Sequence, residues 1–450
     1  VACYSTMYNV YMYGSNLIFS ETGTPNAYNY NGTYGWRVIG DGSVNSINSD
    51  IVNGKWGACY QGIGRCNTFI AGVISEEDKK EMVGEAKFLR ALFYFDLTNM
   101  YGDAPLILDK PDVNTQSFLP RDPKAKIIAQ VIQDLKDAFS ALPATSSQTG
   151  RANKWAAKAL LARVYLYNEM WEEAEKAAEE VINSKKYSLF SDYRNLFSRD
   201  HENNQEVIFD VQYLYPTFVH SGNGLDVVLR QFNSIAPTLD LVKAYDMKDG
   251  SSYTDGKDLY IDRDPRFYAT IVHPGATYMG QIVTNDKFIN TGYTFKKYSR
   301  YDTAAATIDD KNDINIILMR YADILMIYAE ARNERLDKPD QPIYDGINEV
   351  RNRPSVKMPL FDKTKDNFTK EQMRERIRHE RRIEFAGEGW YYNDIRRWKI
   401  AKELMNGSTV QKYDGSIIER RIFNDKNYLF PLPQQEVNDN PNLLPNNPGW

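Results

Sequence analysis

Residues able to hold a metal ion or to act as nucleophiles are few in this chain. The four histidines are His201, His220, His273 and His379, and the three cysteines are Cys3, Cys59 and Cys66. None of them has the short spacing of a zinc or redox motif, and no HExxH, Walker A, EF-hand or nucleophile-elbow pattern occurs. The sequence therefore predicts no catalytic residue, no metal site and no cofactor.

Paired carboxylates are the remaining route to catalysis. Glycosidases use two Asp or Glu residues that come from any part of a chain, so a hydrolase stays open as an alternative. Glu384 and Glu388 share one helix face at i, i+4, which a solvated face explains equally well. The basic run 374–382 is interleaved with glutamates, and this pattern favours i, i+4 ion pairing over phosphate binding.

Aromatic side chains in polar loops are the stronger candidates for binding. The chain has 31 Tyr, and residues 23–36 combine Tyr and Trp with Gly, Asn and Thr, which is typical of an exposed loop. A sugar offers an apolar ring face to aromatic rings and a fringe of hydroxyls to Asn, Asp or Arg. The predicted binding residues are Tyr30, Tyr34, Trp36, Arg37 and Asp41 in this region, and Tyr213, Tyr215 and Tyr278 in a later segment that also holds His220, Arg230 and Phe232.

Any one of these aromatic rings could instead pack its loop onto the body of the protein. That alternative is weaker for the cluster around residue 30, because few aliphatic residues lie beside it in the sequence. We therefore expect Tyr34 and Trp36 to stack on a ligand. Burial of both rings against the helical body would contradict this expectation.

Helices must carry these loops. The clearest pattern is a helical hairpin over 154–168 and 171–183, in which Ala162, Tyr165 and Ala174 have the spacing of a tetratricopeptide repeat. Such a unit has to stack on neighbours to cover its apolar face. The predicted neighbours are 76–101 with 122–142, 315–334 with 341–352, and 370–388 with 391–405, which gives a helical body over about 53–185 and 315–405.

Two further segments lack helical periodicity. Residues 190–310 are predicted to be a loop-rich insertion with a strand near 207–213 and glycine-marked turns. The tail, about 425–450, has five prolines after Tyr428, so we expect it to be extended and free of helix. Residues 1–450 together are interpreted as one mainly α domain whose irregular half binds the ligand.

Composition excludes several classes of protein. The 450 residues carry a net charge of −5 with 42% hydrophobic and 26% charged side chains, as expected of a packed chain and not of a disordered one. A mildly acidic balance argues against binding duplex nucleic acid. No apolar run approaches 18 residues, so no transmembrane helix is predicted. Near the start, Tyr4, Met7, Tyr8, Tyr11 and Met12 suggest one face of a helix.

Several motifs together resemble the SusD/RagB family of Bacteroidetes surface lipoproteins. In chain order they are Glu85-Ala86-Lys87-Phe88-Leu89-Arg90-Ala91, Tyr101-Gly102-Asp103-Ala104-Pro105-Leu106, Asp264-Pro265-Arg266-Phe267, Arg320-Tyr321-Ala322-Asp323-Ile324-Leu325, Val350-Arg351 with Arg353, Glu380-Arg381-Arg382 with Glu384-Phe385, Arg397-Trp398, Pro431-Leu432-Pro433 and Asn446-Asn447-Pro448-Gly449-Trp450. Their order and spacing hold from about residue 53 to the end of the chain.

The resemblance implies a tetratricopeptide-like scaffold of four helix pairs with an irregular, ligand-facing half. It implies a lipid-anchored protein at the outer-membrane cell surface, where it caps a SusC-like TonB-dependent transporter. The motif residues would be scaffold, with charges such as those of Glu380, Arg381 and Arg382 holding helices together. The family's ligand residues lie in variable loops, so none is carried over. The sequence given contains no lipobox, and the N-terminal anchor is inferred from the resemblance alone.

These observations predict a non-catalytic protein that captures oligosaccharides and delivers them to the transporter. Three alternatives remain: the same architecture binding peptides, an all-helical glycoside hydrolase, and a repeat scaffold that only docks proteins. Aromatic loops rich in Asn and poor in carboxylates favour sugar over peptide. A hydrolase would need two carboxylates about 5–9.5 Å apart in an aromatic cleft. The sequence does not identify the sugar, its linkage or the number of transporter copies.

Overall fold

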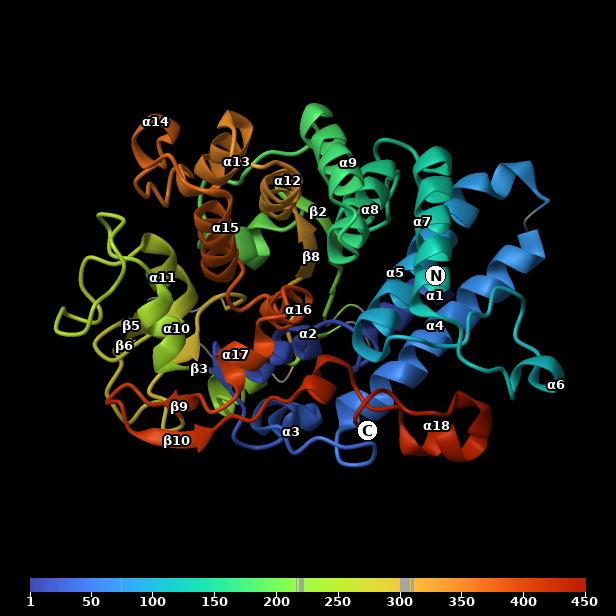
Figure 1. Cartoon of the computed structure of the whole chain (residues 1–450), viewed down its shortest axis with the longest axis horizontal. Coiled ribbons are helices and arrows are strands. Elements are labelled where there is room, and N and C mark those ends of the chain that lie inside the picture. Colours follow the sequence, from blue (N-terminus) through green and yellow to red (C-terminus); the bar gives the residue numbers. More distant parts are fainter. Residues whose placement is uncertain (74, 216, 218–221, 300–307, 309–310) are drawn as a thin grey trace.

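A row of long helices forms one side of the molecule. The computed structural model describes residues 1–73, 75–215, 217, 222–299, 308 and 311–450. The row contains α4 (Asp50–Val73), α5 (Lys80–Tyr101), α7 (Lys124–Ala141), α8 (Lys154–Tyr167), α9 (Trp171–Asn183), α12 (Tyr321–Arg335), α13 (Gln341–Arg351) and α15 (Lys370–Glu384). In Figure 1 it extends from α4, α5 and α7 on the right to α13 and α15 on the left. Each helix of the row from α5 to α13 packs on the one before it, and α15 packs on α12, so the predicted mainly α, repeat-like scaffold is confirmed.

The α8–α9 hairpin shows why these helices stack. Asn153 caps α8 by accepting hydrogen bonds from the backbone N–H groups of Trp155 and Ala156. Ala162 and Ala174 are fully buried, which lets the two helix backbones approach closely. The hairpin therefore forms as its repeat-like spacing predicts, and α12 covers its open side.

One predicted helix boundary is wrong. Residues 315–320 were expected to begin a helix, but Ile316–Arg320 form strand β8, and α12 begins at Tyr321. Strand β8 pairs antiparallel with β2 (Val207–Val211), the strand predicted in the insertion. All five β8 residues are buried, and a continuous aliphatic run buried on both faces has no periodicity that separates strand from helix.

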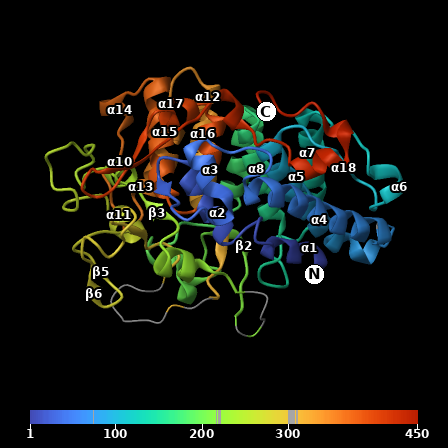
Figure 2. The same ribbon diagram turned by 90° about the horizontal axis from the view of Figure 1, so that it is seen from below.

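The opposite side of the molecule consists of short elements and turns. It contains α10 (Leu239–Ala244), α11 (Pro265–Thr270), β3 (Ala236–Pro237), β4 (Ile271–Val272), β5 (Thr277–Tyr278), β6 (Gln281–Ile282) and β7 (Thr294–Phe295). The N-terminal segment adds α1 (Ala2–Ser5), α2 (Ser15–Phe19), β1 (Ala27–Tyr28) and α3 (Trp36–Asp41). In Figure 2 the β5–β6 hairpin lies at the far end from α1 and the N-terminus.

The C-terminal tail is not free of helix. After α16 (Tyr391–Arg397), α17 (Ala401–Met405), β9 (Thr409–Gln411) and β10 (Ile417–Arg420), the tail contains α18 (Gln434–Asp439) and two 3-10 turns. Pro433 stands at the N-cap of α18, where proline costs no helical hydrogen bond. The prolines therefore border short helices, which corrects the expectation of an extended tail. The backbone N–H of Phe430 donates to Met100 O at 2.7 Å and ties the tail to α5.

A buried ion network joins the two sides. Arg320, at the end of β8, is 1% exposed and donates to Glu206, Glu384 and Glu388 at 2.7–2.9 Å. Glu384 also accepts from Arg266 and Arg353. We call this set the buried ion network, and its members are Glu206, Asp264, Arg266, Lys297, Arg320, Arg351, Arg353, Glu380, Glu384 and Glu388.

The network corrects one interpretation of the sequence. Glu384 and Glu388 do not lie on a solvated face, since their exposed fractions are 0% and 1%. Burial raises the pKa of Glu384, but the guanidinium groups of Arg353, Arg320 and Arg266 outweigh it and hold that pKa well below its usual range.

The basic run pairs mainly with other helices and not within its own. Arg374 pairs with Glu334 at 2.7 Å, and Arg381 pairs with Asp323 at 2.9 Å. Within α15 the pairing is Arg378 with Glu375, three residues apart. This agrees with the scaffold role that the family resemblance implies for these charges.

Replacing Glu384 with Gln should destabilise the protein strongly. The substitution keeps the shape but leaves guanidinium groups buried without their carboxylate, at a cost of about 3–5 kcal/mol. Urea unfolding followed by circular dichroism measures the loss. Glu375→Gln is the control, because Glu375 is 69% exposed and its pair with Arg378 should contribute less than about 1 kcal/mol. Equal midpoints for the two variants would contradict a stabilising role for the network.

Candidate ligand-binding surface

The predicted binding loop is fixed to the body by hydrogen bonds from distant parts of the chain. Asn26 donates to Glu21 Oε2 at 2.8 Å and accepts from Arg382 Nε at 2.9 Å. The buried guanidinium of Arg421 donates to Thr22 O and Ala27 O, both at 2.9 Å. The loop is therefore held by α15 and by the segment after β10.

Trp36 does not lie on the surface, which corrects its predicted role. Its ring is 2% exposed, its Nε1–H donates to Asn16 Oδ1 at 2.8 Å, and it packs edge-on against Tyr392. The turn before it requires Gly35, which has φ +76°, and a Cβ there would lie 2.5 Å from the backbone N of Asp50. This turn directs the indole into the core, so Trp36 anchors the loop.

Tyr213 and Tyr278 are also core residues, at 7% and 2% exposure. The Tyr278 ring packs with Phe288 in a small cluster of the insertion itself. The backbone N–H of Tyr213 donates to Asn315 Oδ1, which joins its segment to the residue before β8. These rings stabilise the irregular half, and a ligand has no access to the buried Tyr278 ring.

Tyr34, in contrast, forms part of an aromatic cluster that reaches solvent. Its ring is half-buried and contacts Phe19 and Tyr11 edge-on, with centroid distances of 5.2 and 6.5 Å. Tyr8 is 37% exposed and meets Tyr213 edge-on at 5.4 Å. We call Tyr8, Tyr11 and Tyr34, together with the half-buried Tyr30 of the same loop as Tyr34, the tyrosine surface.

Polar groups lie beside this surface. The exposed side chain of Asn31 donates to Ser234 Oγ at 2.9 Å, and Arg37 Nη1 donates to Tyr30 O at 2.6 Å. Asp41 is half-buried and accepts from Ser43. Burial raises the pKa of Tyr8 and of Tyr11, so both hydroxyls remain protonated donors at neutral pH.

The structure does not bring every predicted residue to this surface. Tyr215 is half-buried. Its ring lies beside Gly222, and so does the side chain of Lys311. His220 lies outside the described residues, while Arg230 is buried and paired with Asp226 at 3.2 Å. Phe232 is 48% exposed, next to the Asn233–Ser234 segment that contacts Asn31.

Sequence reasoning missed Tyr8 and Tyr11, which were assigned to one face of a helix. The segment instead forms a 3-10 turn over Thr6–Tyr8 and then irregular backbone. A signal was present: Asn9, Gly14, Ser15 and Asn16 give this stretch the same polar, turn-forming setting as the later loop.

One pair of carboxyl groups near Tyr213 has the raised pKa values that a hydrolase would need. Burial, with repulsion from Asp210 and Asp313, raises the pKa of Glu202 to about 7, although the Asn315 N–H opposes it. Burial likewise raises the pKa of Asp210 to about 6. Asp210 is only 4% exposed and hydrogen-bonded to Gln212 and Asn315, so the pair offers a substrate no open approach. In the described part of the chain, no group of three His, Cys, Asp or Glu residues is placed to hold a metal ion.

Trp36→Ala should destabilise the protein by about 3–5 kcal/mol, because it empties a packed site in the core. Tyr34→Ala should cost clearly less, since that ring is half-exposed. Chemical denaturation of both variants checks this order. Equal losses would show that Tyr34 is as much a core residue as Trp36.

Glu202→Gln should flatten the dependence of stability on pH. The folded pKa of about 7 lies above the unfolded value near 4.5, so wild-type stability is lost as pH rises between them. The neutral Gln avoids that loss and should stabilise the protein by up to about 3 kcal/mol at pH 8, with little effect near pH 4. Urea midpoints from pH 4 to 8 measure the profile, and Glu375→Gln should leave it unchanged. If the stability of Glu202→Gln and of the wild type changed with pH in parallel, the raised pKa of Glu202 would be contradicted.

Comparison with known proteins places this fold among solved structures and sequence families. A family model described as "SusD family" matches residues 179–450, and one described as "Starch-binding associating with outer membrane" matches residues 4–166. SusD-like protein P2 of Formosa agariphila is 27% identical, over 93% of this chain and 85% of that protein.

Solved structures agree across nearly the whole chain. A SusD-like carbohydrate binding protein from Bacteroides fragilis superposes with a TM-score of 0.87 at 29% identity, covering 95% of this chain and 93% of that one. A second SusD-like protein from Bacteroides fragilis also superposes with a TM-score of 0.87, at 27% identity, covering 99% of this chain and 96% of that one. The resemblance first seen in scattered motifs is thus confirmed, and the chain belongs to the SusD family.

Proposed function

We propose that this protein captures oligosaccharides at the cell surface and passes them, uncleaved, to a SusC-like TonB-dependent transporter. The observation that carries the proposal is the tyrosine surface, where one exposed and three half-buried rings lie in segments that also present the exposed side chains of Asn31 and Arg37. Rings of this kind stack on the apolar faces of sugars, while Asn31 and Arg37 offer donors to hydroxyls. The carbohydrate binding named for the Bacteroides fragilis relative supports the same ligand class.

Outer-membrane attachment is part of the proposal. The description of the N-terminal family model supports association with the outer membrane. Among the residues that the structure describes, no helix is long and apolar enough to cross a bilayer. We propose that an N-terminal lipid supplies the attachment and that the transporter encloses the ligand from the other side.

A shallow aromatic surface implies modest affinity. It buries little ligand area, so the transporter would complete the binding site and this protein would act as its lid. Peptide capture by the same architecture is the main alternative, and a binding screen separates the two. Calorimetry with neutral oligosaccharides and a mixed peptide pool, followed by product analysis, supports the proposal if sugars bind and stay intact. Binding of peptides alone, or sugar cleavage, overturns it.

Tyr8→Ala and Tyr34→Ala should each weaken the binding of a neutral oligosaccharide about 5- to 30-fold, because each removes a stacking face worth about 1–2 kcal/mol. Isothermal titration calorimetry measures the change. Tyr268→Ala is a matched control: Tyr268 has the same 37% exposure as Tyr8 but lies on α11. If the control weakens binding equally, or the two variants bind as wild type, the tyrosine surface is not the site.

A further inference from the structure

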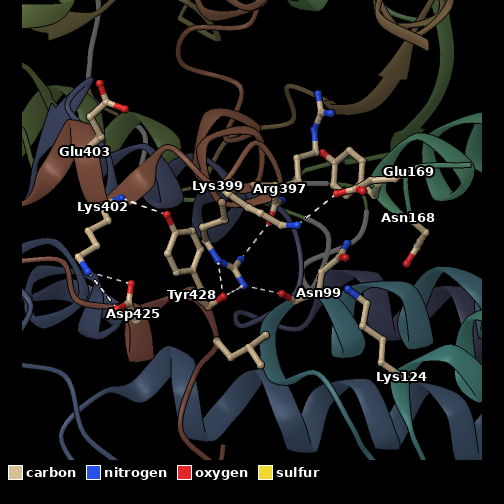
Figure 3. A pocket seen from close by; sticks show the side chains of 14 residues that line it. Asn99, Lys124, Asn168, Glu169, Arg397, Lys399, Lys402, Glu403, Asp425 and Tyr428 are labelled. Atoms are coloured by element: carbon tan, nitrogen blue, oxygen red, sulfur yellow. Dashed lines mark hydrogen bonds and ion pairs between the residues drawn. The ribbon is translucent and has the colours of Figure 1, made fainter. Parts of the chain in front are cut away.

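An open cleft of about 890 Å³ lies where α5, α7, α8, α16, α17 and the tail meet (Figure 3). The predicted binding residues are not part of it. Its lining combines amides and tyrosines with several charged groups: Asn99, Lys124, Tyr167, Asn168, Glu169, Asn393, Arg396, Arg397, Lys399, Lys402, Glu403, Asp425, Tyr428 and Leu429. The balance of these charges indicates what the cleft binds.

Arg396 is a buried cation without a carboxylate partner among the described residues. It is 7% exposed and donates to the backbone oxygens of Asn99 and Tyr428 and, at 3.4 Å, to Asn393 Oδ1. Burial lowers the pKa of this guanidinium, which remains charged at neutral pH. These partners satisfy its N–H groups, and the guanidinium lies 4.8 Å from the centroid of the Tyr392 ring, but no carboxylate among the described residues neutralises its charge.

Lys124 adds a second cation, for which Asp103 is a partial counter-charge because its carboxylate accepts the backbone N–H of Lys124 at 2.7 Å. Its side chain points into the cleft in Figure 3, and within the described chain its ammonium makes no hydrogen bond or ion pair. Burial, with repulsion from Arg396, lowers its pKa. Lys124 is also the first residue of α7, where the helix dipole disfavours a cation. Lys126, in the same turn, is paired with Asp122 at 2.6 Å.

Most other charges of the cleft are paired with one another or with neighbouring residues, and no ion pair among the described residues includes the Lys124 ammonium or the Arg396 guanidinium. Arg397 is neutralised by Glu330 and Asp394. Lys399 and Lys402 meet Glu169 and Asp425 at 3.4 and 3.0 Å in solvent-exposed pairs, which contribute little and exchange readily with an incoming anion. Glu403, the last carboxylate of the lining, is exposed on α17.

We infer that this cleft is a second ligand site, which takes an anionic saccharide bearing a carboxylate or a sulfate. The anionic group lies beside Lys124, whose ammonium donates charge-assisted hydrogen bonds to it, and the buried charge of Arg396 attracts it from behind the cleft wall. The amides of Asn99, Asn168 and Asn393 offer donors and acceptors to hydroxyls, and Tyr428 offers an aromatic surface to a sugar ring. This amide and tyrosine lining favours an acidic sugar over an acidic peptide. The site goes beyond the proposed capture of oligosaccharides at the tyrosine surface.

Calorimetry on the whole chain with four probes tests the inference. The probes are a galacturonic acid oligomer, a sulfated galactose oligomer, a neutral galactose oligomer and an oligo-aspartate of equal charge. We expect one or both acidic sugars to bind more tightly than the neutral one, and to bind more weakly as salt is raised. Comparison of the galacturonic acid oligomer with the sulfated galactose oligomer shows whether the cleft recognises a carboxylate or a sulfate.

Single substitutions locate the binding site of the acidic sugar. Lys124→Gln should weaken the acidic sugar tenfold or more, as expected for loss of a charge-assisted contact, while Lys126→Gln should leave it unchanged. Substituting Arg396 would also release the tail, because Arg396 donates to Tyr428 O. Lys402→Gln therefore serves as the second cleft variant, and we expect it to lower the affinity for the acidic sugar less than Lys124→Gln does. Tyr34→Ala should not affect the acidic sugar, which separates this site from the tyrosine surface. The inference is overturned if oligo-aspartate binds as tightly, if neither acidic sugar exceeds the neutral one, or if Lys124→Gln binds as wild type.

Discussion

The buried charge of Glu384 is the constraint on which the rest of the structure depends. Three guanidinium groups converge on this one carboxylate, from α11, from the end of β8 and from the segment after α13. Taking such charges out of water is costly unless every one is paired, so the three segments have to meet in a single arrangement. The helical row and the loop-rich half are thereby fixed to each other by electrostatics as well as by apolar packing.

Much of the fold could be predicted from the sequence, because helical periodicity and capping are local signals. The hairpin of α8 and α9 is one example, with its buried alanines and its Asn153 cap. Strand β8 was missed because a fully buried aliphatic run has no distinguishing period. Glu384 was interpreted as solvated because spacing along one helix does not reveal partners more than sixty residues away, such as Arg320.

The candidate surface was only partly predictable for a related reason. Loop composition identified Tyr34 and its polar neighbours, but the direction of a side chain depends on a single turn. Gly35 turns the chain so that Trp36 enters the core while the ring before it stays at the surface. Lys124 and Arg396 were out of reach altogether, since their lack of ion-pair partners among the described residues is visible only once helices distant in sequence are assembled.

The attachment of the N-terminal loop by Arg382 and Arg421 has a consequence for biosynthesis. Thr22, Asn26 and Ala27 are made early, whereas the groups that hold them are made after more than four-fifths of the chain. Contacts between such distant segments form only when both are present, so the earlier helices of the row, from α4 to α9, have the opportunity to fold before these contacts form. A ribosomal product that stops before Arg382 lacks the clamp and does not present the finished surface. The complete attachment of this loop therefore requires a chain that extends at least through Arg421.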